Sequence, residues 1–224
     1  MYVETMTPEQ MVAQYKKDAE QFKAKLPYMC SAINRELKKQ KTFPYRRIIT
    51  WRSALGNDYF IKLVFRSRHV RSENSAAHVN MFAVMNFSDG TYMFDGSSAC
   101  IDYNRWFEGI LYKPHFFKRY AQRFGLDNGQ GVIKQFLLRL HDATISRCQL
   151  TEAHGDGFDV MVISNDGLLL GTCENKFITI RTFLTIEQLN SKQYANANDE
   201  AKNILDNYET ILSLQPKADI VYAK

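Results

Sequence analysis

The sequence predicts an α+β fold, with an antiparallel sheet or sheets and with N-terminal and C-terminal helices packed on them. Two blocks of period-two apolar segments, within residues 45–94 and 158–183, are typical of strands joined by tight turns. Capping patterns precede the first block and follow the second, which places helices at both ends. No Pro/Ser-rich linker separates the blocks. Residues 1–110 (helices and a meander) and 111–224 (helix, sheet, helix) are therefore expected to form one continuous unit.

The N-terminal helix begins after Thr7, a suitable N-cap, and Gln10 closes a capping box. Pro27 is expected to interrupt this helix, because an internal proline removes a hydrogen bond and crowds the preceding turn. A second helix is then expected over residues 28–40, ending in a basic run that suits the negative end of the helix dipole.

The first block contains four expected strands joined pairwise by turn signals at residues 55–58 and 88–90. Consecutive strands of this kind form an antiparallel meander. The expected strands are 47–52, 59–66, 79–87 and 91–94.

Between the second and third of these strands, basic residues alternate at Arg66, Arg68 and Arg71. Such a segment could follow a nucleic-acid backbone by contacting successive phosphates. It could equally be an edge strand that uses charge to avoid pairing with another chain. Both interpretations remain open from the sequence.

The segment 112–124 is the part of the chain where the sequence suggests chemistry. Pro114 suits the first helical position, where its missing N–H costs nothing. Wound at about 100° per residue, the helix separates an aromatic side, expected to be buried, from a polar side. The polar side consists of His115, Lys118, Arg119, Gln122 and Arg123.

On that side, His115, Arg119 and Arg123 follow one another at intervals of four residues, and the helix contains no acid to offset them. The positive helix N-terminus favours a neutral imidazole. A neutral histidine beside two guanidinium groups suits general base catalysis next to a phosphate. The alternative is an ordinary solvated face whose arginines pair with Glu108 or Asp127.

The remainder of the chain predicts a core helix over residues 132–141, a hairpin over 158–172 with a turn at 164–167, and a third strand at 176–183. The glycines at 129–131 mark a helix entry rather than a phosphate loop. A capping box at residues 185–188 begins a C-terminal helical region expected to extend to about Leu214.

Other site classes find little support in the sequence. The segment 154–159 contains ligand-type side chains, but its glycines favour a turn, and no metal or cofactor is expected. The four cysteines form no CxxC pair and are expected to be free thiols in a reducing compartment. No apolar run is long enough for a membrane span, and no signal peptide precedes the first helix. The protein is therefore expected in the cytoplasm, without membrane association.

The net charge of +5 is unevenly distributed. Between Lys41 and Gly125 there are thirteen Lys and Arg residues against six Asp and Glu, a surplus of seven, so the rest of the chain carries about two net negative charges. A basic middle region favours an anionic partner such as RNA or another nucleic acid.

The order of elements over residues 112–186, led by the H-x-x-x-R-x-x-x-R helix, resembles ribonuclease toxins of the BrnT/RelE type. The resemblance implies metal-independent cleavage of RNA. In that case His115 is the general base or acid, and Arg119 and Arg123 stabilise the charge on the phosphorane. Lys176 or Thr182 on the facing strand would contact phosphate, and Lys118 adds a further nucleic-acid contact.

The chain also departs from this pattern, with about a hundred additional N-terminal residues and a long C-terminal helical region. A phage or mobile-element protein that keeps the fold without the activity is the alternative. It would bind nucleic acid, or a protein partner, through the same basic surface. Cleavage predicts activity in a chelator, whereas a binding module predicts salt-sensitive binding without turnover. A structural protein predicts neither.

Overall fold

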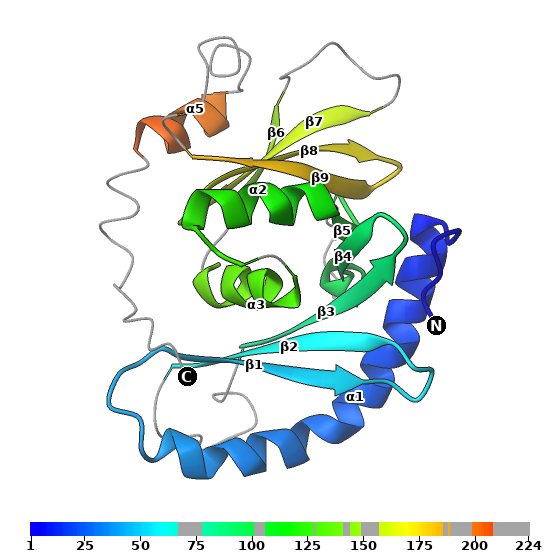
Figure 1. Cartoon of the computed structure of the whole chain (residues 1–224), viewed down its shortest axis with the longest axis vertical. Coiled ribbons are helices and arrows are strands. Elements are labelled where there is room, and N and C mark those ends of the chain that lie inside the picture. Colours follow the sequence, from blue (N-terminus) through cyan, green and yellow to red (C-terminus); the bar gives the residue numbers. More distant parts are fainter. Residues whose placement is uncertain are drawn as a thin grey trace.

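The computed structural model describes residues 1–66, 78–100, 106–127, 129–140, 144–148, 157–185, 188 and 199–207. In this part of the chain four α-helices, one short 3-10 helix and nine strands alternate (Figure 1). The predicted α+β class is confirmed. The elements in chain order are α1 (Pro8–Leu37), β1 (Tyr45–Arg52), β2 (Asp58–Phe65), β3 (His78–Phe87), β4 (Gly90–Asp95), η1 (Ser97–Cys100), β5 (Gly109–Tyr112), α2 (Pro114–Phe124), α3 (Gln130–Arg139), β6 (Thr144–Cys148), β7 (Phe158–Ser164), β8 (Gly167–Glu174), β9 (Phe177–Leu184) and α5 (Asp199–Asp206).

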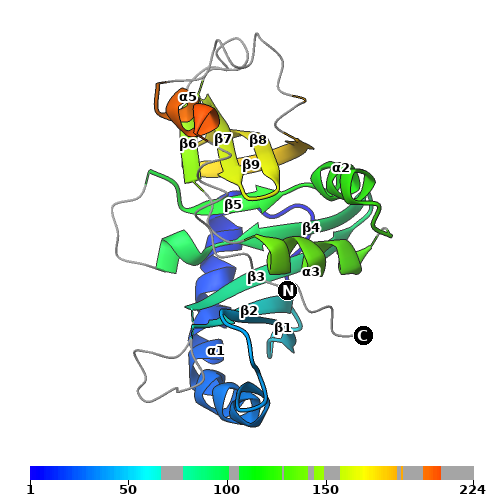
Figure 2. The same ribbon diagram turned by 90° about the vertical axis from the view of Figure 1, so that its left-hand side faces the viewer.

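The nine strands form one sheet in the order β1-β2-β3-β4-β5-β9-β8-β7-β6. Every neighbouring pair is antiparallel except β5 and β9, which run parallel. The sheet curls around α2 and α3, and α1 lies outside it (Figures 1 and 2). We call the side that faces α2 and α3 the inner face and the side that faces α1 the outer face.

The inner face carries an aromatic core that fixes α2 against β9. The Phe116 ring lies 5.1 Å from Phe136 of α3 and 6.3 Å from Phe183 of β9, and Tyr120 lies 5.2 Å from Phe183. These four side chains are fully buried or nearly so. At the end of α3, the buried Lys62 of β2 donates a hydrogen bond to a terminal backbone carbonyl, a favourable place for a cation.

The outer face carries a second core beneath α1. Alternate residues of β2 point towards this helix and are buried with it, whereas Phe60 between them belongs to the inner core. The α1 helix begins with the predicted capping box, in which Thr7 and Gln10 satisfy each other's backbone groups. The outward-facing residues of β2 are Tyr59, Ile61, Leu63 and Phe65.

The predicted break at Pro27 is wrong, because α1 continues from Pro8 to Leu37 with Pro27 inside it. Pro27 lies on the exposed side of the helix, where solvent can satisfy the carbonyl that loses its partner. Buried Phe22 and Ile33 on either side hold both parts of the helix against the sheet. Packing therefore outweighs the local cost of the proline, and the long helix curves around the sheet (Figure 1).

The hairpins β1–β2, β3–β4 and β7–β8 and the strand β9 confirm the predicted strands. Two strands, β5 and β6, were not predicted. For the C-terminal helical region, the described residues contain α5 and a single residue, Gln188, in a helical turn. No helix in the described part of the chain combines the length and the apolar character needed to cross a membrane.

Candidate functional site

The start of α2 is held by two contacts with the sheet. The backbone N–H of Lys113 donates to the Ile180 carbonyl of β9 at 3.0 Å. Gly90 has φ +140°, and a Cβ at this position would lie 2.8 Å from the Pro114 ring. The glycine thus allows the β3–β4 turn to pack directly on the first turn of α2, next to His115.

The two sides of α2 are separated as the sequence predicted. Phe116, Phe117, Tyr120 and Ala121 are buried. The polar residues are exposed, and we call them the α2 surface: His115, Lys118, Arg119, Gln122 and Arg123. His115, Arg119 and Arg123 are therefore brought together on one solvent-facing side of a helix.

The cations of the α2 surface have no acidic partner among the described residues. Glu108, one candidate partner of the arginines, instead lies 3.6 Å from Lys176. Within the described part of the chain no carboxylate reaches ion-pair distance of Arg119 or Arg123. The Arg119 Nε donates a long hydrogen bond, 3.4 Å, to His115 Nε2.

A groove of about 560 Å³ lies beside this surface, and we call it the α2 groove. Its walls come from the β3–β4 turn, the first turns of α2 and the start of α3. Neither α2 nor α3 has a side-chain cap, and neither has an acid in its first turn. The groove is therefore next to two uncapped, partially positive helix ends. Lining residues with ionisable side chains are Asp89, Tyr92, Lys113, His115 and Lys118.

The acid of the α2 groove already has a partner. The Tyr92 hydroxyl donates to Asp89 at 2.7 Å. This hydrogen bond, together with partial burial, raises the pKa of Tyr92 to about 12. Tyr92 therefore stays protonated near neutral pH, and the three remaining ionisable side chains of the groove are basic.

The other predicted nucleic-acid contacts are not gathered here. Arg66 is exposed at the end of β2, where it contacts His78 at 3.1 Å, and the length of β3 separates it from the groove. Arg68 and Arg71 lie outside the described residues. Lys176 lies beside the start of β5, at the opposite end of that strand from His115, because β5 and β9 run parallel.

Thr182 is half-buried on β9. Its neighbour Phe183 packs on α2, so the alternation of the strand turns Thr182 to the other face of the sheet. Among the described residues, no hydrogen bond or ion pair joins Thr182 to the α2 surface, and its predicted role in binding phosphate stays a prediction.

A second polar cluster was not recognised in the sequence. Asp166, in the β7–β8 turn, accepts two hydrogen bonds from Arg139 of α3, at 2.9 and 2.7 Å, and one from the Tyr120 hydroxyl at 2.5 Å. The Arg139 guanidinium also lies 4.4 Å from the centre of the Phe124 ring. From the sequence, Asp166 is predicted only as a turn residue, because Arg139 and Tyr120 come from helices distant in the chain.

Among the described residues, no three His, Cys, Asp or Glu side chains are placed to hold a metal ion. The segment 154–156 lies outside the described residues, so the histidine there is not located. Comparison of the chain with protein-family models, with curated proteins and with solved structures finds no significant match.

Proposed function

We propose that the α2 surface binds the phosphate backbone of RNA. The observation that carries this proposal is the set of exposed cations, Lys118, Arg119 and Arg123, that have no acidic partner among the described residues. Like charges one turn apart repel each other by a few tenths of a kcal/mol, and an anion between them removes this cost.

The α2 groove supports the same ligand class. It follows the start of α2 with Lys113 and Lys118 on its walls, and it passes two uncapped helix ends that favour negative charge. The proposed location is the cytoplasm, where a buried free thiol such as Cys173 remains reduced.

The proposal is tested by fluorescence anisotropy with a labelled single-stranded RNA of about twenty nucleotides, over a series of salt concentrations. Each of Lys118→Gln, Arg119→Gln and Arg123→Gln is expected to weaken binding and to reduce the slope of log K against log salt by about 0.7 per lost phosphate contact. Lys25→Gln is the matched control, because Lys25 is an exposed cation on α1 at the outer face. Equal affinity of all four variants and the unchanged protein would contradict the proposal.

A second candidate function is metal-independent cleavage of the bound RNA. The contact from Arg119 to His115 favours it, because it places an imidazole nitrogen beside a guanidinium at the edge of the groove. RNA supplies its own nucleophile in the 2′-hydroxyl, so the protein need only provide a base and stabilise the phosphorane charge. The resemblance to ribonuclease toxins supports the same reaction.

Cleavage is tested on structured RNA in excess EDTA, with and without His115→Ala. The variant is expected to lower the cleavage rate on the order of 10²-fold or more. A strand with 2′-deoxy nucleotides should stay intact, because the nucleophile is missing. Equal cleavage by the unchanged protein and the variant, or no cleavage by either, rejects this candidate and leaves binding alone.

A further inference from the structure

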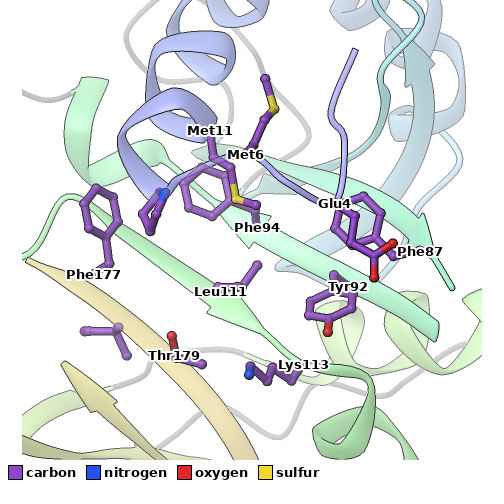
Figure 3. A pocket seen from close by; sticks show the side chains of 12 residues that line it. Glu4, Met6, Met11, Phe87, Tyr92, Phe94, Leu111, Lys113, Phe177 and Thr179 are labelled. Carbon is purple, nitrogen blue, oxygen red and sulfur yellow. The ribbon is translucent and has the colours of Figure 1, made fainter. Parts of the chain in front are cut away.

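A pocket of about 230 Å³ opens on the outer face of the sheet, where α1 begins (Figure 3). It lies over β4, β5 and β9, and the N-terminal segment before α1 forms one of its walls. It is separate from the α2 surface, which belongs to a helix on the inner face. Apart from its charged rim, its lining is largely aromatic and aliphatic.

The floor of the pocket follows from the strand register. Phe94 of β4 pairs with Leu111 of β5, and Leu111 pairs with Thr179 of β9, so the three side chains form one row across the outer face. Tyr15 of α1 covers Phe94, with the two ring centres 6.0 Å apart. Leu111 and Thr179 are only half-buried. Exposure to solvent therefore increases along this row, from the covered Phe94 ring to the half-buried Leu111 and Thr179.

Gly109 contributes to the shape of this floor. A Cβ at Gly109 would lie 2.7 Å from the Phe94 ring, so the glycine lets that ring lie flat against β5. Phe177 of β9 pairs with Gly109 and also lines the pocket, so its ring lies next to the same part of β5 (Figure 3). Phe94 and Phe177 are buried and Leu111 is half-buried, so the apolar floor of the pocket is accessible mainly at Leu111.

Lys113 supplies the positive charge of the pocket. It follows Leu111 by two residues in extended backbone, with φ −82° and ψ 157°, and it therefore faces the same side of the sheet. Its side chain is half-buried and forms no ion pair with a described residue. Figure 3 shows its amine on the same side of the pocket as Thr179.

The other polar side chains of the rim are already engaged. Glu4 accepts a hydrogen bond from the Ser88 hydroxyl at 2.9 Å, and the Tyr92 hydroxyl donates to Asp89 at 2.7 Å. Both lie across the pocket from Thr179 (Figure 3). The negative charge of Glu4 at that rim disfavours a second anionic group on a ligand.

We propose that this pocket binds a small monocarboxylate with an apolar body. The carboxylate accepts hydrogen bonds from the Lys113 ammonium and the Thr179 hydroxyl, and the apolar body lies on Leu111, next to the rings of Phe94 and Phe177. The volume is below the usual range of about 300–1,000 Å³ for ligand pockets, which favours a short chain or a single ring. Lys113 also lines the α2 groove, so the two proposals share this residue, but carboxylate binding is measured without nucleic acid and can fail or succeed by itself.

The proposal is tested with the full chain by isothermal titration calorimetry, using hexanoate, hexanol and hexylammonium as matched probes. Hexanoate is expected to bind, hexanol to bind at least about tenfold more weakly because it lacks the charge, and hexylammonium not to bind. Lys113→Met should weaken hexanoate about tenfold or more. Lys118→Met is the control, since Lys118 lies outside this pocket on α2.

A second variant, Leu111→Trp, fills the pocket from its floor and should abolish hexanoate binding, while circular dichroism checks that the chain remains folded. Three results would overturn the proposal: no heat with hexanoate, equal binding of hexylammonium, or equal affinity of Lys113→Met and the unchanged protein. Retained binding by folded Leu111→Trp would overturn it as well. None of these readouts uses nucleic acid, so failure here leaves the α2 surface untouched.

Discussion

Two buried carboxylates, one on each side of the sheet, are held in opposite ways. Asp166 contacts the inner helices, and its side chain is 6% exposed. It accepts two hydrogen bonds from the Arg139 guanidinium and a third from Tyr120. A full positive charge in bidentate geometry thus faces a full negative charge.

Asp18 lies in the outer core beneath α1 and is fully buried. Its Oδ2 accepts from the Asn57 amide at 2.6 Å and from the Tyr59 hydroxyl at 2.7 Å, both neutral donors. Its Oδ1 has no hydrogen-bond partner among the described residues, and no described cation pairs with it.

The two buried acids therefore have different structural roles. At Asp166 the charge itself links the β7–β8 turn to α2 and α3, because a guanidinium depends on it. At Asp18 the carboxylate contributes its size and one hydrogen-bond-accepting oxygen. A neutral amide has nearly the same size and also has an accepting oxygen. Replacing each acid by its isosteric amide therefore distinguishes the two.

The largest effect is expected for Asp166→Asn. The amide removes the negative charge and turns an N–H₂ group towards Arg139, whose side chain is 25% exposed. Breaking one side of a buried ion pair costs roughly 3–5 kcal/mol, and the partial exposure of Arg139 places the expected loss near the lower value, about 3 kcal/mol. The free energy of unfolding in urea measures it.

Glu108→Gln is the matched control for this variant, because Glu108 pairs with Lys176 in an exposed bridge whose side chains are 42% and 66% accessible. Solvent screens such a pair, and the expected loss is at most about 1 kcal/mol. If both amide variants cost the same, charge pairing is not what distinguishes Asp166.

An intermediate effect on the free energy of unfolding is expected at alkaline pH, from the tyrosines that donate hydrogen bonds to the two acids. Burial, and secondly contact with Asp166, raises the pKa of Tyr120 above the ordinary value near 10. Burial likewise raises the pKa of Tyr59. A tyrosine with a raised pKa in the folded state contributes stability that is fully present below about pH 10. That stability is lost as the pH rises towards the folded pKa.

Between pH 10 and 11, each such tyrosine is expected to cost up to about 1.4 kcal/mol of unfolding free energy. Tyr120→Phe and Tyr59→Phe should each flatten this decline, and Tyr28→Phe should leave it unchanged, because Tyr28 is 77% exposed. Urea titrations at pH 9, 10 and 11 measure the slopes. An equal slope for all three variants would show that the alkaline loss comes from other groups.

Some features of the fold and of the candidate site could be predicted from the sequence alone. The turn residues at 88–90 and 164–167 predicted their hairpins, because such turns are encoded by adjacent residues. The exposed side of α2 was equally predictable, since helical spacing alone separates His115, Arg119 and Arg123 from the aromatic residues.

Long-range pairing was not predictable in the same way. The four residues of β5 carry no clear alternation, and they are a strand because β4 and β9 supply the hydrogen bonds, with Phe177 pairing to Gly109 across 68 positions. Asp18 reads as an ordinary helix residue, and only Asn57 and Tyr59, about forty residues later, explain its burial. Neither the pairing of β5 with β9 nor the contacts of Asp18 can be recognised in a short stretch of the sequence.

The smallest effect is expected for Asp18→Asn. The side-chain oxygen of the amide can still accept from Asn57 and Tyr59, while the variant removes a buried charge that no described cation compensates. The new N–H₂ group takes the position of Oδ1. One turn earlier on α1, the Gln14 amide nitrogen is also buried and has no hydrogen-bond partner among the described residues, and turning that amide over offers an oxygen to the new donor.

These gains and costs nearly cancel, so Asp18→Asn should change the free energy of unfolding by less than about 1 kcal/mol. Asp18→Ala is the matched control. It removes the acceptor altogether and leaves the buried Asn57 amide without this partner, at about 1–3 kcal/mol, whereas the Tyr59 hydroxyl can still donate to the Tyr2 hydroxyl 3.1 Å away. A loss with Asp18→Asn as large as that of Asp166→Asn would mean that the charge at Asp18 is also compensated, and the contrast between the two faces of the sheet would then fail.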